Sequence, residues 1–120
     1  MRREELYLAD IIEAADSIQT FLRGVERTDF VGNDLLRSAV LQKLIIIGEA
    51  AARLPKDFRN RHADVEWNDI VSFRNIAVHA YFSVDWGMVW VTAKIEVPEL
   101  RRIVEKIFVQ EYTDFDPVDK

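Results

Sequence analysis

The sequence predicts a single all-α domain. Three observations support this prediction: apolar residues recur at helical spacing through most of the chain, only four glycines and three prolines occur among 120 residues, and 49% of the residues are hydrophobic. So few glycines and prolines do not suit the many turns of an all-β fold, and the apolar content is sufficient for a packed core. The length fits one domain, since domains most often have about 100–150 residues.

The first predicted helix starts near Leu8 and stops near Gly24, a residue suited to ending a helix. Its apolar residues follow one another in steps of three and four, as on one face of a helix. They are Leu8, Ile11, Ala15, Ile18 and Leu22. A short connection follows, and its candidate N-caps are Thr28, Asp29, Asn33 and Asp34.

The second predicted helix runs from about Asp34 to Leu54 and has two apolar stripes. One stripe consists of Leu36, Val40, Leu44, Ile47, Ala51 and Leu54. The other consists of Leu41, Ile45, Gly48 and Ala52. A helix that is apolar on two sides packs against two partners. The second stripe, which contains small Gly48 and Ala52, therefore packs either against a second copy of the chain or against another helix of the same bundle.

Pro55 ends the second helix, and two further helical regions are predicted beyond it. A polar segment with a short helix, 56–66, leads to a helix that ends near Val78, and 81–84 form a turn. Asp85 then caps a long final helix whose stripe consists of Trp86, Trp90, Ala93, Val97, Leu100, Val104 and Ile107. Pro98 is expected to kink this helix or to leave a carbonyl unpaired, and the chain is expected to fray after Phe108.

Charge is distributed unevenly along the chain, whose net charge is −5. An acidic balance argues against a nucleic-acid partner. We predict a domain at 1–109 and an acidic, flexible tail at 110–120, which holds four of the acidic residues. A local basic patch supplies candidate RNA-binding residues: Arg53, Lys56, Arg59 and Arg61. The alternative for both segments is an ordinary solvated surface.

Several classes of protein are excluded by what the sequence lacks. A chain without cysteine has no disulfide framework, thiolate zinc site or cysteine nucleophile. The two histidines, His62 and His79, are not at a metal-ligand spacing, and no glycine-rich nucleotide loop or G-x-S-x-G motif occurs. No signal peptide is recognised, and no apolar run approaches the ~20 residues of a membrane span, so we expect a cytoplasmic protein.

Four polar residues interrupt an otherwise apolar segment and form the candidate site: Arg74, Asn75, His79 and Tyr81. On a continuous helix Arg74 and Tyr81 share one face, and Asn75 and His79 share another. Arginine binds phosphate bidentately and histidine transfers protons near neutral pH, so these groups suit phosphodiester chemistry. The alternatives are a structural ion pair for Arg74 and a core position for His79. Glu49 either pairs with an arginine, for example Arg74, or is simply exposed.

The segment from Arg74 to Tyr81 resembles the R-N-x(3)-H-x-Y signature of HEPN-domain proteins, and more specifically that of HepT, the toxin of HepT/MntA toxin–antitoxin systems. Further segments agree with that subfamily in order and spacing: R-R and Y-L-A-D-I within 2–11, I-I-G-E-A-A-A-R-L at 46–54, W-N-D-I at 67–70 and Y-F-S-V-D at 81–85. The resemblance covers roughly residues 1–109. Ala80 stands where glycine is common in this family.

The resemblance implies an up-and-down bundle of four to five helices that dimerises through helices. It also implies a metal-independent endoribonuclease without a cofactor, whose site lies at the dimer interface. Arg74 would bind the scissile phosphate, His79 would act as base or acid while the ribose 2′-hydroxyl attacks, and Asn75 would orient either group. The product would be a cyclic phosphate. Tyr81 is similar to the tyrosine that a minimal nucleotidyltransferase antitoxin, MntA-like, modifies with AMP to silence the toxin.

Two alternative functions are also consistent with the sequence. One is a non-catalytic HEPN module that binds a nucleotidyltransferase or a nucleotide; absence of RNase activity in the unmodified dimer would favour it. The other is a dimeric helical scaffold in which the polar motif forms a buried network. A large loss of stability in Arg74→Ala protein would favour the scaffold.

Overall fold

The computed structural model describes residues 3–112, and each regular element in that range is a helix or a helical turn. Four long helices form the frame: α1 (Glu4–Leu22), α3 (Asp34–Arg53), α5 (Trp67–His79) and α7 (Val97–Glu111). Shorter segments connect them: α2 (Arg27–Val31), α4 (Lys56–Arg61), the 3₁₀ turn η1 (Tyr81–Ser83), α6 (Trp86–Val91) and the π-helical turn η2 (Thr92–Glu96). The prediction of an all-α fold is confirmed.

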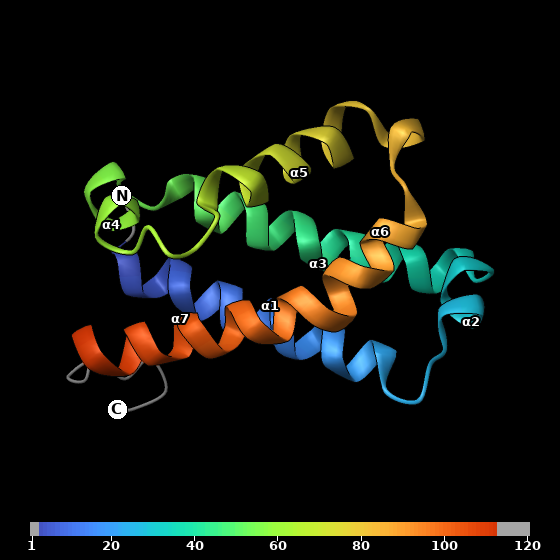
Figure 1. The fold of residues 1–120 in the computed structure, drawn as a ribbon, viewed down its shortest axis with the longest axis horizontal. Helices are drawn as coiled ribbons and strands as arrows, with labels where there is room; N and C mark the ends of the chain where they lie inside the picture. The colour runs from blue at the N-terminus through green and yellow to red at the C-terminus, as the bar shows by residue number, and fades with distance from the viewer. Residues whose placement is uncertain (1–2, 113–120) are drawn as a thin grey trace.

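Successive long helices run in alternating directions, so the bundle is up-and-down (Figure 1). α1 and α3 pack against each other at the centre, α5 packs against α3, and α7 packs against α1 (Figure 1). α5 therefore lies on one flank of the bundle. Of its residues only Trp67 and Ala77 are buried, whereas Ile76 and Val78 are 46% and 47% exposed. The helix that carries the predicted motif thus has one covered side and one open side.

The core lies between α1, α3 and the last helix, where the apolar stripes meet. The five stripe residues of the first predicted helix are all buried, as that spacing requires. Aromatic side chains from the short helices close the two ends of the core. Phe30 of α2 lies 6.4 Å from Trp86 and 5.6 Å from Trp90, and Phe58 of α4 lies 6.1 Å from Trp67, between ring centroids. Helix α2 was not predicted, because five residues are too few to show a helical period.

Two of the predicted N-caps are found with their side chains in place. The Asn33 side chain accepts a hydrogen bond from the backbone N–H of Leu36 at 3.0 Å, so α3 begins at the next residue, as predicted. The Asp85 carboxylate accepts from the N–H groups of Gly87 at 2.9 Å and Met88 at 3.2 Å. Each cap satisfies N–H groups that have no partner within the helix itself.

The final helix passes through α6, η2 and α7 without a break, but its winding changes before Pro98. Proline has no N–H, so a regular α-helix would leave the carbonyl of Lys94 without its partner. The chain widens into a π-helical turn just before this point, and the N–H of Val97 donates to the carbonyl of Thr92, five residues earlier. The proline is thus accommodated by a local change of helical winding.

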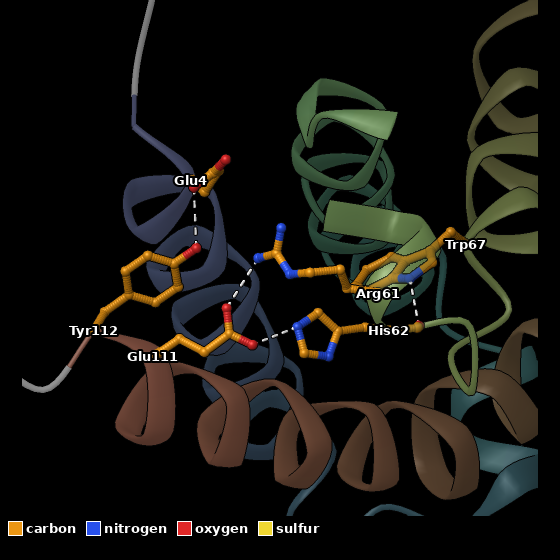
Figure 2. A network of polar contacts seen from close by, with 6 residues as sticks. All are labelled: Glu4, Arg61, His62, Trp67, Glu111 and Tyr112. Atoms are coloured by element: carbon orange, nitrogen blue, oxygen red, sulfur yellow. Dashed lines mark hydrogen bonds and ion pairs between the residues drawn. The ribbon is translucent and has the colours of Figure 1, made fainter. Parts of the chain in front are cut away.

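The expected fraying of the last helix is wrong, because a polar network holds its end (Figure 2). The Glu111 carboxylate lies 3.0 Å from the Arg61 guanidinium and 2.6 Å from Nε2 of His62. The Tyr112 hydroxyl donates to the Glu4 carboxylate at 3.0 Å. These contacts join the ends of α7, α4 and α1, and Figure 2 shows the three helices meeting there.

The predicted tail therefore starts within the folded body, since α7 reaches Glu111 and Tyr112 is bound to α1. Its remaining part, 113–120, lies outside the described residues. Burial, with the adjacent Glu4 carboxylate as a smaller cause, raises the pKa of Tyr112 to about 12.

This raised pKa predicts a loss of stability at high pH. Above about pH 10 the tyrosine of the unfolded chain ionises, whereas folded Tyr112 keeps its proton up to about pH 12. The contribution of Tyr112 is therefore complete below pH 10 and is lost as the pH rises towards 12. The free energy of unfolding in urea, measured between pH 9 and pH 11.5, should fall more steeply for the wild type than for Tyr112→Phe. Parallel curves for the two proteins would contradict this assignment.

Candidate active site

Gly48 sets the distance between α3 and α5. A Cβ atom built on Gly48 would lie 2.4 Å from Cβ and 2.8 Å from Cγ of Arg74, which is closer than packed side chains approach. Only a residue without a side chain allows the two helices to come this near. At Gly48 the second apolar stripe of α3 therefore packs within the chain, against α5. The glycine gives no support for contact with a second copy.

Arg74 is held by an ion pair that crosses the same helix contact. Its NH1 donates to Oε2 of Glu49 at 2.5 Å, and the two side chains are 21% and 42% exposed. Of the two alternatives left open for Glu49, the structure shows pairing with Arg74. Nε of Arg74 is buried and has no hydrogen-bond partner among the described residues. The guanidinium is thus fixed on one side and keeps unused donors.

Asn75 and His79 lie on a different side of α5 from Arg74. His79 is the last residue of the helix, and both it and Asn75 are exposed. Within residues 3–112 neither side chain has a hydrogen bond or ion pair with another residue. Five residues separate Arg74 from His79, which turns the side chain by about 140° around the helix axis. A single chain therefore does not bring the guanidinium and the imidazole to one point.

Tyr81 lies in a turn beyond α5, as the predicted helix end near Val78 and turn at 81–84 require, so the shared face of a continuous helix does not form. α5 ends at His79, and Ala80 leaves the helix with φ −138° and ψ 51°. Tyr81 then lies in η1, where its ring meets the edge of Phe82 at 5.6 Å between centroids and that of Trp86 at 6.1 Å. The tyrosine is 42% exposed. The seven-residue spacing assumed a continuous helix, and the turn at Ala80 removes that assumption.

The residues of the predicted basic patch differ in their contacts. Arg53 lies with Arg74 on a pocket of about 430 Å³, which is also lined by Tyr7, Glu49 and Ala52. Arg61 is bonded to Glu111, and its guanidinium lies 5.4 Å from the ring centroid of Phe58. The remaining two residues, Lys56 and Arg59, belong to α4. Tyr7 is not among the predicted site residues, because the sequence does not distinguish a buried residue that lines a pocket from one that lies in the core.

His62 contacts residues outside the R-N-x(3)-H-x-Y motif. Its imidazole bonds to Glu111, packs 4.7 Å from the Phe58 ring, and belongs to the network of Figure 2.

Among residues 3–112 no three histidine or carboxylate side chains gather closely enough to hold a metal ion. None of the helices described combines the length and the apolar character that crossing a membrane takes.

The helical bundle and the R-N-x(3)-H-x-Y motif define a HEPN-type domain, and comparison with known proteins supports this class. A family model described as HepT-like ribonuclease matches residues 11–107. "Putative RNase MJ1380" of Methanocaldococcus jannaschii is 36% identical over 104 residues, which cover 87% of this chain and 95% of that protein. "Probable ribonuclease HepT" of Thermococcus cleftensis is 37% identical over 106 residues, covering 88% and 96%. No solved structure gives a significant match. The chain belongs to the HepT-like ribonuclease family.

The contact at Gly48 predicts that Gly48→Ala destabilises the protein by about 1–3 kcal/mol, because the new Cβ overlaps the stem of Arg74. Gly87→Ala is the matched control. Its Cβ would meet the far end of the Arg27 side chain, which is flexible enough to move away, and the Asp85 carboxylate only at 3.3 Å. Urea unfolding of the two variants measures the difference. Equal stability would show that α3 and α5 have room for a side chain.

Proposed function

We propose that this protein is a metal-independent endoribonuclease that acts as a homodimer and is the toxin of a toxin–antitoxin pair. The observation that carries this proposal is the arrangement on α5: Arg74 is fixed in a pocket by Glu49, and His79 is exposed at the end of the helix. Membership in the HepT-like ribonuclease family supports RNA as the substrate. The names of the relatives, which are RNases, agree with that choice.

Arg74 is the phosphate-binding residue in this proposal. A guanidinium remains charged at any physiological pH and offers five N–H donors in a planar fork. Glu49 occupies NH1, so the other donors are available for the oxygens of the scissile phosphate. Negative charge grows on these oxygens as a nucleophile approaches the phosphorus, and a fixed cation stabilises that charge more than it stabilises the ground state.

His79 is the proton-transfer residue. As a base it takes the proton of the ribose 2′-hydroxyl, whose oxygen attacks the adjacent phosphorus while the bond from phosphorus to the 5′ oxygen breaks. The leaving oxygen receives a proton from an acid, for which His79 of the partner subunit is the candidate. The products are a 2′,3′-cyclic phosphate and a 5′-hydroxyl. Asn75 orients the phosphate or the imidazole.

We place the complete site between two copies of the chain. Within one chain Arg74 and His79 point in different directions, and a second copy related by twofold symmetry would supply the missing group. Exposed apolar side chains on α5 and on the segments that follow it support a contact with a second copy, because exposed apolar surface marks interaction sites. They are Ile76, Val78, Phe82, Met88, Val91 and Ile95.

Tyr81 is the regulatory residue in the proposal. A partner nucleotidyltransferase, MntA-like, attaches AMP to its hydroxyl, and the exposure of the side chain supports access by an enzyme. The adenylyl group is bulky and carries a negative phosphate. Placed two residues beyond His79, it would block the path of the RNA and repel its backbone. The toxin would then be silent until the modification is removed.

RNA cleavage tests the catalytic assignment. His79→Ala and Arg74→Ala should each reduce cleavage of a labelled RNA by at least about 10²-fold, because each removes one proton-transfer or charge-stabilising group. Cleavage by the wild type should persist in excess EDTA and leave cyclic phosphate ends. A mixed dimer of the two variants keeps only one His79, so it should stay inactive if the base and the acid of one site are the His79 side chains of both subunits.

His62→Gln is the control for loss of a histidine outside the motif, and it should retain cleavage when the protein is folded. Full activity of folded His79→Ala protein, or a strict need for a metal ion, would overturn the mechanism. Absence of RNA cleavage by the unmodified wild-type dimer would favour the non-catalytic HEPN module instead.

Modification of Tyr81 has a separate test. Incubation with a minimal nucleotidyltransferase of the antitoxin class and ATP should add adenylyl groups to the wild type and abolish RNA cleavage. Tyr81→Phe should cleave RNA, because a phenyl ring preserves the packing against Trp86, and should resist silencing. Tyr112→Phe, which lacks a hydroxyl bound to Glu4, should be modified like the wild type. Intact-protein mass spectrometry detects the groups, and their attachment to Tyr81→Phe protein would place the modified residue elsewhere.

A further inference from the structure

We infer that the pocket between α1, α3 and α5 is a second phosphate subsite, in which Arg53 binds the RNA phosphate next to the one bound by Arg74. This inference rests on the proposed ribonuclease function and adds to it a second contact with the substrate. It concerns binding of the RNA strand and assigns Arg53 no part in proton transfer.

The two arginines reach this pocket from different helices. Arg74 comes from the middle of α5, and Arg53 is the last residue of α3. Glu49 lies one helical turn before Arg53 on the same side of α3, since residues four apart are neighbours on a helix surface. The pocket of about 430 Å³ therefore has a guanidinium from each helix, with the Glu49 carboxylate also in its lining.

Arg53 combines an unpaired, exposed side chain with a place in the lining of the pocket. No ion pair or hydrogen bond engages its side chain within the part of the chain that the structure describes, and the residue is exposed. Arg61 is bonded to Glu111, and Nε of Arg59 is buried without a partner. Among these three arginines, Arg53 is the one whose guanidinium both lines the pocket and remains available to solvent.

The charges of the pocket select an anion. The lining includes two arginines and one glutamate, and the carboxylate of that glutamate is already paired with Arg74. Arg53 thus gives the pocket an excess positive charge that no residue nearby is shown to neutralise. Arginine matches the oxygens of a phosphate with two parallel N–H donors. In an RNA strand each nucleotide brings one such phosphate, so a second arginine beside Arg74 suits the neighbouring phosphate.

Binding to single-stranded RNA tests the subsite without relying on cleavage. In full-length His79→Ala protein, the dissociation constant for a fluorescein-labelled RNA is measured by anisotropy at several salt concentrations. Adding Arg53→Ala should weaken binding about five- to tenfold and reduce the slope of log K against log salt by about 0.7, the value for one phosphate on a single strand. Arg61→Ala removes the same charge from an arginine that Glu111 already occupies, and should leave the slope unchanged.

Arg53→Lys keeps the positive charge, so its binding should show the same salt dependence as protein with Arg53. It should bind RNA more weakly, because lysine lacks the forked N–H donors of a guanidinium. Thermal unfolding checks that all variants are folded. Equal changes in slope for Arg53→Ala and Arg61→Ala, or no change for Arg53→Ala, would overturn the subsite. The phosphate of a free nucleotide has the same chemistry, so AMP is titrated as well. If AMP binds as tightly as RNA, and only when Arg53 is present, the assignment of the pocket to RNA is overturned.

The same variants separate this inference from the proposed function. If the wild type does not cleave RNA but binding still depends on Arg53, the ribonuclease proposal fails and the phosphate subsite stands. If the wild type cleaves RNA, and Arg53→Ala protein that retains His79 cleaves it with an unchanged KM, the subsite proposal fails and the ribonuclease proposal stands.

Discussion

The candidate site depends on the close contact between α3 and α5 at Gly48. Because Gly48 has no side chain, the stem of Arg74 lies directly against α3, and its guanidinium meets the carboxylate of the next residue, Glu49. A partly buried charge needs such a partner, since burial without one is costly. A larger residue at Gly48 would move α5 outward and separate the pair. The contact therefore determines both how α5 packs and where Arg74 points.

Most of the fold could be predicted from the sequence, because long helices are recognised by the spacing of their apolar residues and by the capping or helix-ending residues at their boundaries. Asn33, Pro55 and Asp85 mark boundaries for local reasons, a cap or a missing N–H, and the structure confirms the helix boundaries that they indicate. Short elements have no such signal. α2 and the burial of Phe30 depend on Trp86 and other residues distant in sequence, and only the folded chain brings them together.

The sequence suggests candidate residues for the site, but it does not determine how they are arranged. The predicted helix end near Val78 already separated Tyr81 from the helix that carries Arg74, but where the turn places the tyrosine is known only from the structure. The basic cluster between Arg53 and Arg61 looked like one patch because its members are close in sequence. Glu111, fifty residues after Arg61, neutralises one member of that cluster. Which cation remains free depends on tertiary pairing, and sequence spacing contains no information about it.

Tertiary pairing also decides how the net charge should be interpreted. A net charge of −5 argues against RNA only if all charges act at the same place. At physiological ionic strength the Debye length is about 8 Å, so acidic residues at the far end of the bundle contribute little to the field at the pocket. Arg53 and Arg74 line the pocket in which we propose that phosphates bind, and the one carboxylate in the lining is paired with Arg74. An acidic chain is thus compatible with an anionic substrate, because local unpaired cations, rather than the total charge, set the field that the substrate meets.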